Sequence, residues 1–128
     1  MTKIKLLLTL MALALPTMPA MASENGFFIM LSSATTTSTS GTIQPQAGKV
    51  SFQATARTTA GAGALTAIIS ASNDGLQFIT LGTITLVLST TENSDGFTSD
   101  NAWKVYKSSI SAISGTGARA TITAASKN

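Results

Sequence analysis

The sequence contains no cysteine and no histidine among its 128 residues. Without cysteine the chain can form neither a disulfide nor a thiolate metal site. Without histidine it also lacks the commonest general base and the commonest metal ligand, so serine–histidine and cysteine–histidine nucleophiles are excluded. Carboxylates are then the main remaining catalytic groups, and the sequence favours a protein that binds or builds over an enzyme.

Charged residues are scarce, at 10% of the chain, with eight basic and five acidic side chains. Two of the basic residues, Lys3 and Lys5, lie within the N-terminal residues 1–22. The other six are scattered singly along the sequence: Lys49, Arg57, Lys104, Lys107, Arg119 and Lys127. The basic cluster typical of a nucleic-acid-binding protein is missing, so no nucleic-acid partner is expected. A surface with so little charge favours contacts with other proteins.

Residues 1–22 have the features of a secretory signal peptide. A basic start at Lys3 and Lys5 precedes an apolar run over 6–15, and Ala20-Met21-Ala22 fits an A-x-A cleavage site. The run of about ten residues is too short to cross a bilayer, which needs roughly 20. We expect either a cleaved leader, which would give a periplasmic or extracellular protein without a stable membrane span, or a retained hydrophobic N-terminal helix.

Residues 23–48 are expected to form an extended arm that includes the first strands. A continuous apolar run predicts a short strand, buried on both sides or at a subunit contact. We take its residues as a candidate interface: Phe27, Phe28, Ile29, Met30 and Leu31. A Ser/Thr-rich stretch follows as far as Pro45 and Gly48, with a second short strand expected near Thr42 and Ile43.

Residues 49–128 show the period-two alternation of strands with one buried face. Val50, Phe52 and Ala54 alternate with polar residues, and the same pattern recurs over 65–71 and 84–88. Small-residue turns separate these runs, and Asn-Asp-Gly at 73–75 predicts a hairpin. The predicted fold is all-β, a single antiparallel, jelly-roll-like β-sandwich of seven or eight strands over 49–128, following the N-terminal helix and arm.

Four acidic residues lie in the predicted turns: Asp74, Glu92, Asp95 and Asp100. A pair of them could act in glycoside hydrolysis, but Asp beside Gly, Asn or Ser commonly bonds the local backbone instead. We favour the turn role and assign no catalytic residue, no cofactor and no metal site. Residues 90–101 are predicted to form the longest polar loop of the sandwich.

Trp103 and Tyr106 are three residues apart, so on a regular strand they point to opposite faces. We expect Trp103 to fill the core and Tyr106 to lie on the outer face at a subunit contact. A bulge between Lys107 and Ser109 would restore the register of the following apolar residues. In an alternative interpretation, Trp103 forms a ligand face for carbohydrate together with Asp95 and Asp100.

Several short motifs resemble small all-β proteins encoded among the structural genes of tailed bacteriophages and prophages. The motifs are F-Q-A, G-A-G-A, S-N-D-G, L-G-T-I-T-L, D-G-F, W-K and A-I-S-G-T-G-A, at residues 52–54, 61–64, 72–75, 81–86, 95–97, 103–104 and 112–118. The resemblance covers residues 50–124. It implies a virion-associated protein that decorates the head or serves as a tail or fibre accessory, without catalytic residues.

The expected function is therefore that of a non-enzymatic structural subunit of a phage particle. Its expected partners are copies of itself, in a homo-oligomer, and other virion proteins. Two alternatives assume that residues 1–22 are a cleaved secretory leader. One is an exported β-sandwich that recognises cell-surface carbohydrate, and the other is a secreted, self-assembling fibre subunit that donates its 27–31 segment to a neighbour.

Overall fold

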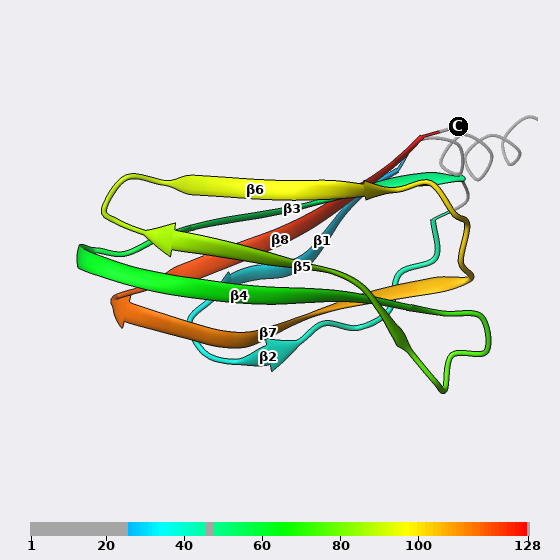
Figure 1. Ribbon diagram of the computed structural model, residues 1–128, viewed down its shortest axis with the longest axis horizontal. Helices are drawn as coiled ribbons and strands as arrows, with labels where there is room; N and C mark the ends of the chain where they lie inside the picture. Colours follow the sequence, from blue (N-terminus) through cyan, green and yellow to red (C-terminus); the bar gives the residue numbers. More distant parts are fainter. Residues whose placement is uncertain (1–25, 46–47, 128) are drawn as a thin grey trace, which may run out of the picture.

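The computed structural model describes residues 26–45 and 48–127, which contain eight strands and no helix (Figure 1). The strands are β1 Gly26–Ala34, β2 Ser38–Thr39, β3 Lys49–Arg57, β4 Ala60–Ser72, β5 Ile79–Leu88, β6 Asn93–Ser99, β7 Val105–Thr116 and β8 Arg119–Lys127. They form two antiparallel four-stranded sheets, so the predicted all-β sandwich is confirmed. The predicted leader and N-terminal helix, at residues 1–22, lie outside the described residues.

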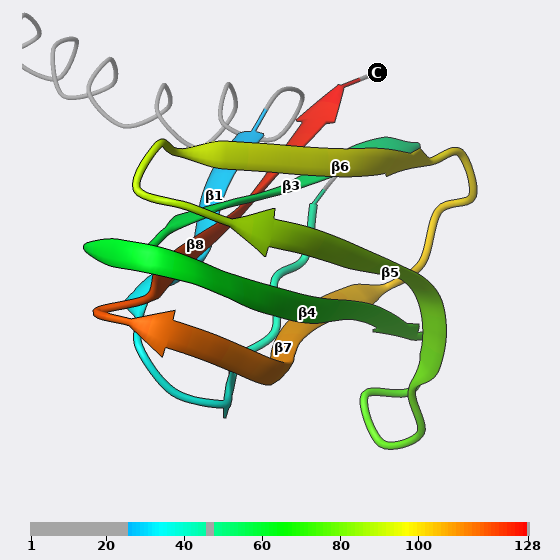
Figure 2. The same ribbon diagram turned by 60° about the vertical axis from the view of Figure 1, so that its left-hand side comes forward.

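The two sheets have the strand orders β1-β8-β3-β6 (sheet A) and β2-β7-β4-β5 (sheet B). β1 pairs with β8, β2 with β7, β3 with β6 and β4 with β5, which is the order of one long hairpin rolled up on itself (Figure 2). Only the β4–β5 connection stays within a sheet; every other connection crosses from one sheet to the other. Consecutive strands therefore mostly face each other across the core.

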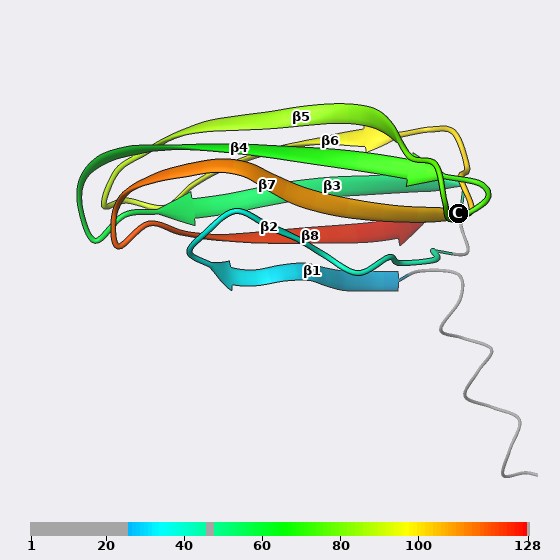
Figure 3. The same ribbon diagram turned by 90° about the horizontal axis from the view of Figure 1, so that it is seen from below.

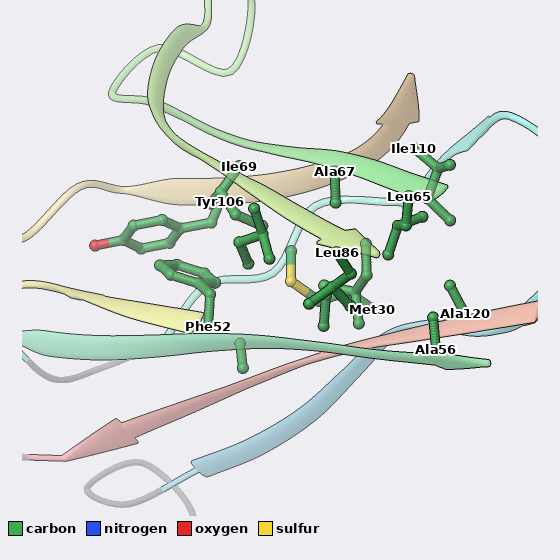
Figure 4. Packing of buried hydrophobic residues seen from close by; sticks show 14 of the residues in the cluster. Met30, Phe52, Ala56, Leu65, Ala67, Ile69, Leu86, Tyr106, Ile110 and Ala120 are labelled. Atoms are coloured by element: carbon green, nitrogen blue, oxygen red, sulfur yellow. The ribbon is translucent and has the colours of Figure 1, made fainter. Parts of the chain in front are cut away.

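The core combines small side chains from sheet A with large ones from sheet B. The buried residues of β3 and β8 are mainly alanines, whereas β4, β5 and β7 contribute leucine, isoleucine and one tyrosine. Ala56 and Ala120 of sheet A lie opposite Leu65 and Ile110 of sheet B (Figure 4). Pairing small with large residues lets two sheets interdigitate at the density of a protein interior.

The segment predicted as an extended arm supplies an edge strand to each sheet. β1 pairs with β8 at the edge of sheet A, and β2 pairs with β7 at the edge of sheet B. Ile43 adds an isolated bridge to Tyr106, close to the position of the predicted second short strand. The described part of this segment thus pairs with strands of its own chain.

Residues 90–101 were predicted as a loop, but most of them form β6 at the other edge of sheet A. The strand was not predicted because its residues are polar, with the exception of Phe97, which packs against the core. The Phe97 ring lies 5.5 Å from the Phe52 ring between their centroids. It also fills the space above Gly82, where an added Cβ would come within 2.7 Å of the ring. The missing side chain at Gly82 therefore lets β6 close this end of the core.

Two smaller predictions about turns and bulges can also be checked. The hairpin at Asn73-Asp74-Gly75 is confirmed, because β4 and β5 pair on either side of it. The β4–β5 register also shifts between Ile69 and Ser70, which places a bulge beside Gly82 on β5. The bulge predicted between Lys107 and Ser109 is wrong. The register of β7 instead shifts at Ser111, between Ile110 and Ala112.

Substitution of Met30 tests whether β1 is an integral part of the sandwich. Its side chain is buried in the core, while Ile29 next to it points outward. We expect Met30→Ala to lower the free energy of unfolding by about 2–3 kcal/mol because it leaves a cavity. The matched variant Ile29→Ala should change it by less than about 0.5 kcal/mol. Urea unfolding, repeated at several protein concentrations, measures both; equal effects of the two variants would contradict the placement of β1.

Candidate interaction surfaces

The described residues offer surfaces rather than an enclosed site. No pocket opens among them, and no group of three acidic, cysteine or histidine residues is placed to hold a metal ion. Within the same part of the chain, no helix is long and apolar enough to cross a membrane. Any function that these residues support by binding must therefore use the faces or edges of the sandwich.

The candidate interface residues of β1 divide between the core and the solvent. Met30 is buried, Phe28 and Leu31 are half-buried, and the side chains of Phe27 and Ile29 are 68% and 60% exposed. The expectation of a strand buried on both sides is therefore wrong. A strand turns successive side chains to opposite faces, so a run of consecutive apolar residues at a sheet edge must expose every second one. Only Phe27 and Ile29, named here the β1 edge patch, remain free for a partner.

A second set of exposed apolar side chains lies along β5 and in the loop before it. Leu76 lies in the β4–β5 loop, Ile79 at the start of β5 and Val87 near its end, and they are 84%, 49% and 78% exposed. We name these three residues the β5 edge patch, although they are spread along the strand: Ile79 lies level with the buried Ala71 and Val87 level with the exposed Ala64. The sequence analysis missed them. Val87 could have been found, because it is an apolar residue at an outward-facing position between the buried Leu86 and Leu88.

The two edge patches lie on opposite sides of the sandwich. β1 and β2 are the first strands of their sheets, and β5 and β6 are the last. The view in Figure 3 shows β1 and β2 along one side and β5 and β6 along the other. A second copy could therefore reach one patch without covering the other.

The free edge of β1 is regular only at its beginning. Its register with β8 shifts between Ile29 and Leu31 and again before Ala34, and Ser33 has a φ of 49°. Such bulges interrupt a sheet edge and prevent it from pairing along its whole length. The uninterrupted part of the edge, residues 26–29, is the part that carries the β1 edge patch.

Tyr106 is fully buried, so its predicted position on the outer face is wrong. Its ring lies 5.5 Å from the Phe52 ring, and its hydroxyl donates a hydrogen bond to the Asn101 carbonyl at 3.2 Å. The same hydroxyl accepts a bond from the Trp103 backbone N–H at 3.1 Å. β7 alternates regularly from 106 to 110, which places Tyr106 in phase with the buried Ile110. Tyr106 therefore holds the β6–β7 connection from the inside and is not available to a partner.

Trp103 takes a peripheral position, where a core position was predicted. It is half-buried against the edge of the core, and its indole Nε1 is buried without a partner among the described residues. Asp95 lies in the middle of β6 opposite Ala54, where its Oδ1 accepts a bond from the Gly96 N–H at 2.8 Å. Asp100 is exposed just beyond β6. The structure does not gather Trp103, Asp95 and Asp100 around a common hollow.

Asp74 organises the β4–β5 loop in the way that its turn position predicts. Its Oδ1 accepts bonds from the backbone N–H groups of Leu76 and Gln77, at 2.9 and 3.0 Å, and from the Ser72 hydroxyl at 2.7 Å. These donors favour the ionised carboxylate, and the Gln77 and Leu76 amides contribute most. Together they lower the pKa of Asp74 to about 2.

In comparisons with protein-family models, curated proteins and solved structures, the chain matches none. Its function must therefore be inferred from its own residues and surfaces.

The low pKa of Asp74 predicts a pH-dependent contribution to stability. Because the pKa is depressed in the folded state, the contribution is present above the unfolded pKa near 4 and is lost as the pH falls through about 2. The difference in urea midpoint between the wild type and Asp74→Ala should therefore shrink between pH 4 and pH 2. An NMR titration should place the carboxyl pKa well below its usual value, and Ser72→Ala should raise it. A titration at the ordinary value would contradict the loop geometry.

Proposed function

We propose that this chain is a non-enzymatic structural subunit of a bacteriophage particle, either a capsid decoration protein or a tail or fibre accessory protein. It acts through protein–protein contacts with copies of itself and with other virion proteins. The observation that carries the proposal is the exposure of large apolar side chains on two opposite edges of a sandwich whose described surface has no pocket. Burying such side chains favours association, at roughly 25 cal/mol for each Å² of apolar surface.

The strand order also supports a structural role. A hairpin of eight strands rolled into two sheets is the arrangement of the jelly roll, which many viral capsid proteins and lectins share. The same fold serves several functions, so the strand order supports the proposal only together with the surface. The resemblance of the turn motifs over 50–124 to virion-associated proteins supports the particle as the location.

The two edge patches differ from each other, and this favours a head-to-tail contact. Phe27 and Ile29 lie on sheet A, whereas Leu76, Ile79 and Val87 follow the edge of sheet B. When the β1 edge of one copy meets the β5 edge of the next, the contact repeats with the same sense around a ring or along a filament. This is the geometry of a subunit that is present in many copies.

The other expected functions gain no support from a specific observation. A carbohydrate site built on Trp103 would need an exposed ring, and Trp103 packs against the core. A fibre that grows by strand donation would need the 27–31 segment to be free, and this segment already pairs with β8 of its own chain.

Head-to-tail assembly predicts a specific result when two blocked variants are mixed. The first variant, Phe27→Asp with Ile29→Asp, blocks the β1 edge, and the second, Ile79→Asp with Val87→Asp, blocks the β5 edge. Each alone should be monomeric, because a charge cannot be buried without a partner. An equimolar mixture should form dimers and nothing larger, since one free edge of each kind remains. Native mass spectrometry and light scattering after gel filtration measure the masses.

The control variant is Ala112→Asp, which adds one negative charge at an exposed position on β7, away from both edges. It should assemble like the wild type. Two results would overturn head-to-tail assembly: a wild-type chain that stays monomeric at high concentration, or a mixture of the two blocked variants that stays monomeric.

The location in a particle has a separate test. Mass spectrometry of gradient-purified phage particles should find this chain at many copies per particle, and its first peptide should show whether residues 1–22 are retained. Recovery of the chain only from the soluble exported fraction, beginning at Ser23, would contradict the virion proposal and favour the exported module.

A further inference from the structure

The fold brings four of the scattered basic residues together on one face. β3 and β8 are the central strands of sheet A, and their register pairs Lys49 with Lys127 and Arg57 with Arg119. All four side chains are exposed on the outer face, because the residues that alternate with them are buried in the core. The sequence shows these residues as isolated charges, yet the sheet places them as two pairs of like charges.

Each of these pairs is unfavourable for the isolated molecule. Like charges directly opposite one another on neighbouring strands repel and destabilise a sheet. Continuing the β3–β6 register places Glu92 level with Arg57 and Asp100 level with Lys49. No ion pair, however, joins any of these residues within the described part of the chain. Each end of the face therefore keeps two cations that an anionic partner could neutralise.

The surface between the two pairs is uncharged and polar. Apart from Ala125, it is formed by Ser51, Gln53, Thr55, Thr121 and Thr123, which we name the polar strip. The two basic pairs are eight residues apart along β3, which corresponds to about 27 Å at roughly 3.3–3.4 Å per residue. A small anion can reach only one pair, whereas an extended anionic polymer can reach both and follow the strip between them.

We propose that the outer face of β3 and β8 binds an acidic polysaccharide. The arginine pair offers planar guanidinium groups that can bind carboxylates with two parallel hydrogen bonds, and the lysine pair anchors the other end of the polymer. The hydroxyl and amide groups of the polar strip can exchange hydrogen bonds with sugar hydroxyls. This activity is additional to structural assembly; the face is bounded by β1 on one side and β6 on the other, and the β1 edge patch lies at its border.

Other polyanions fit this face less well. A single-stranded nucleic acid would need aromatic side chains for base stacking, and the polar strip has none. A duplex is read by elements that enter its grooves, which the flat face of a sheet cannot do. A lipid surface would need apolar side chains between the cations, whereas on this face Phe27 and Ile29 lie at the β1 border, beside β8, and the strip between the cations carries hydroxyl groups.

The test measures binding of polygalacturonate to the full chain by calorimetry at low salt. Two variants remove one pair each, Arg57→Gln with Arg119→Gln and Lys49→Gln with Lys127→Gln. A matched control, Lys104→Gln with Lys107→Gln, removes the same net charge away from the face. Each face variant should weaken binding about tenfold or more, while the control should change it by less than about threefold. Binding should also fall as the salt concentration rises.

Four further probes decide the class of the partner. Neutral dextran should not bind, and trigalacturonate, which is too short to reach both pairs, should bind much more weakly than the polymer. A DNA duplex and vesicles rich in phosphatidylglycerol should bind more weakly than polygalacturonate.

The proposal is overturned if the control variant loses as much affinity as the face variants, since net charge alone would then explain binding. It is equally overturned if DNA or the vesicles bind more tightly than polygalacturonate, or if polygalacturonate does not bind. Urea unfolding shows whether the variants are as stable as the wild type. Removing one like-charge pair should leave the unfolding midpoint unchanged or slightly raised, so a loss of affinity cannot be attributed to a loss of folding.

Discussion

The close approach of an alanine-rich inner face to a face of large aliphatic residues is the constraint on which the structure depends. Sheet A contributes Ala54, Ala56, Ala120 and Ala124 to the core, so the side chains of sheet B reach almost to its backbone. This packing leaves room for only a few large residues on sheet A. Phe52 is the main one, and the rings of Tyr106 and Phe97 pack against it from either side. Glycine at position 82 then becomes necessary because the Phe97 ring occupies the space of a Cβ.

A thin core of this kind leaves much of the function to the outer faces and the edges. The rolled hairpin places the first and last strands of the sheets on opposite sides, where large apolar side chains stay exposed. It also places β3 and β8 side by side in the middle of sheet A, where their outward residues form a polar face with basic ends. Assembly uses β1 and β5 and binding uses β3 and β8, and the two surfaces adjoin where β1 pairs with β8.

The chain shows clearly where reasoning from alternation succeeds and where it fails. Strands with strong alternation, such as β3 and β4, were identified, although β4 extends beyond the alternating residues 65–71 to Ala60–Ser72. β6 was missed because its residues are polar and only Phe97 packs against the core, as is common at a sheet edge. Tyr106 was expected on the wrong face because the bulge of β7 lies at Ser111, beyond the point where the sequence suggested it, and Trp103 is only half-buried because it precedes β7. A bulge reverses the face to which each side chain on one side of it points, so an error in the position of the bulge changes which side chains are expected to be buried.

The sequence by itself determined the strongly alternating strand segments, the residues that turn inward in those segments, and the absence of thiol and imidazole chemistry. These properties are local, because they depend on period two and on which residue types are present. The tertiary structure decided which strands are neighbours, and so which outward residues meet. Lys49 and Lys127, or Arg57 and Arg119, are far apart in the sequence and adjacent in the sheet. Their register is set by the packing of the inward alanines between them, which no local pattern records.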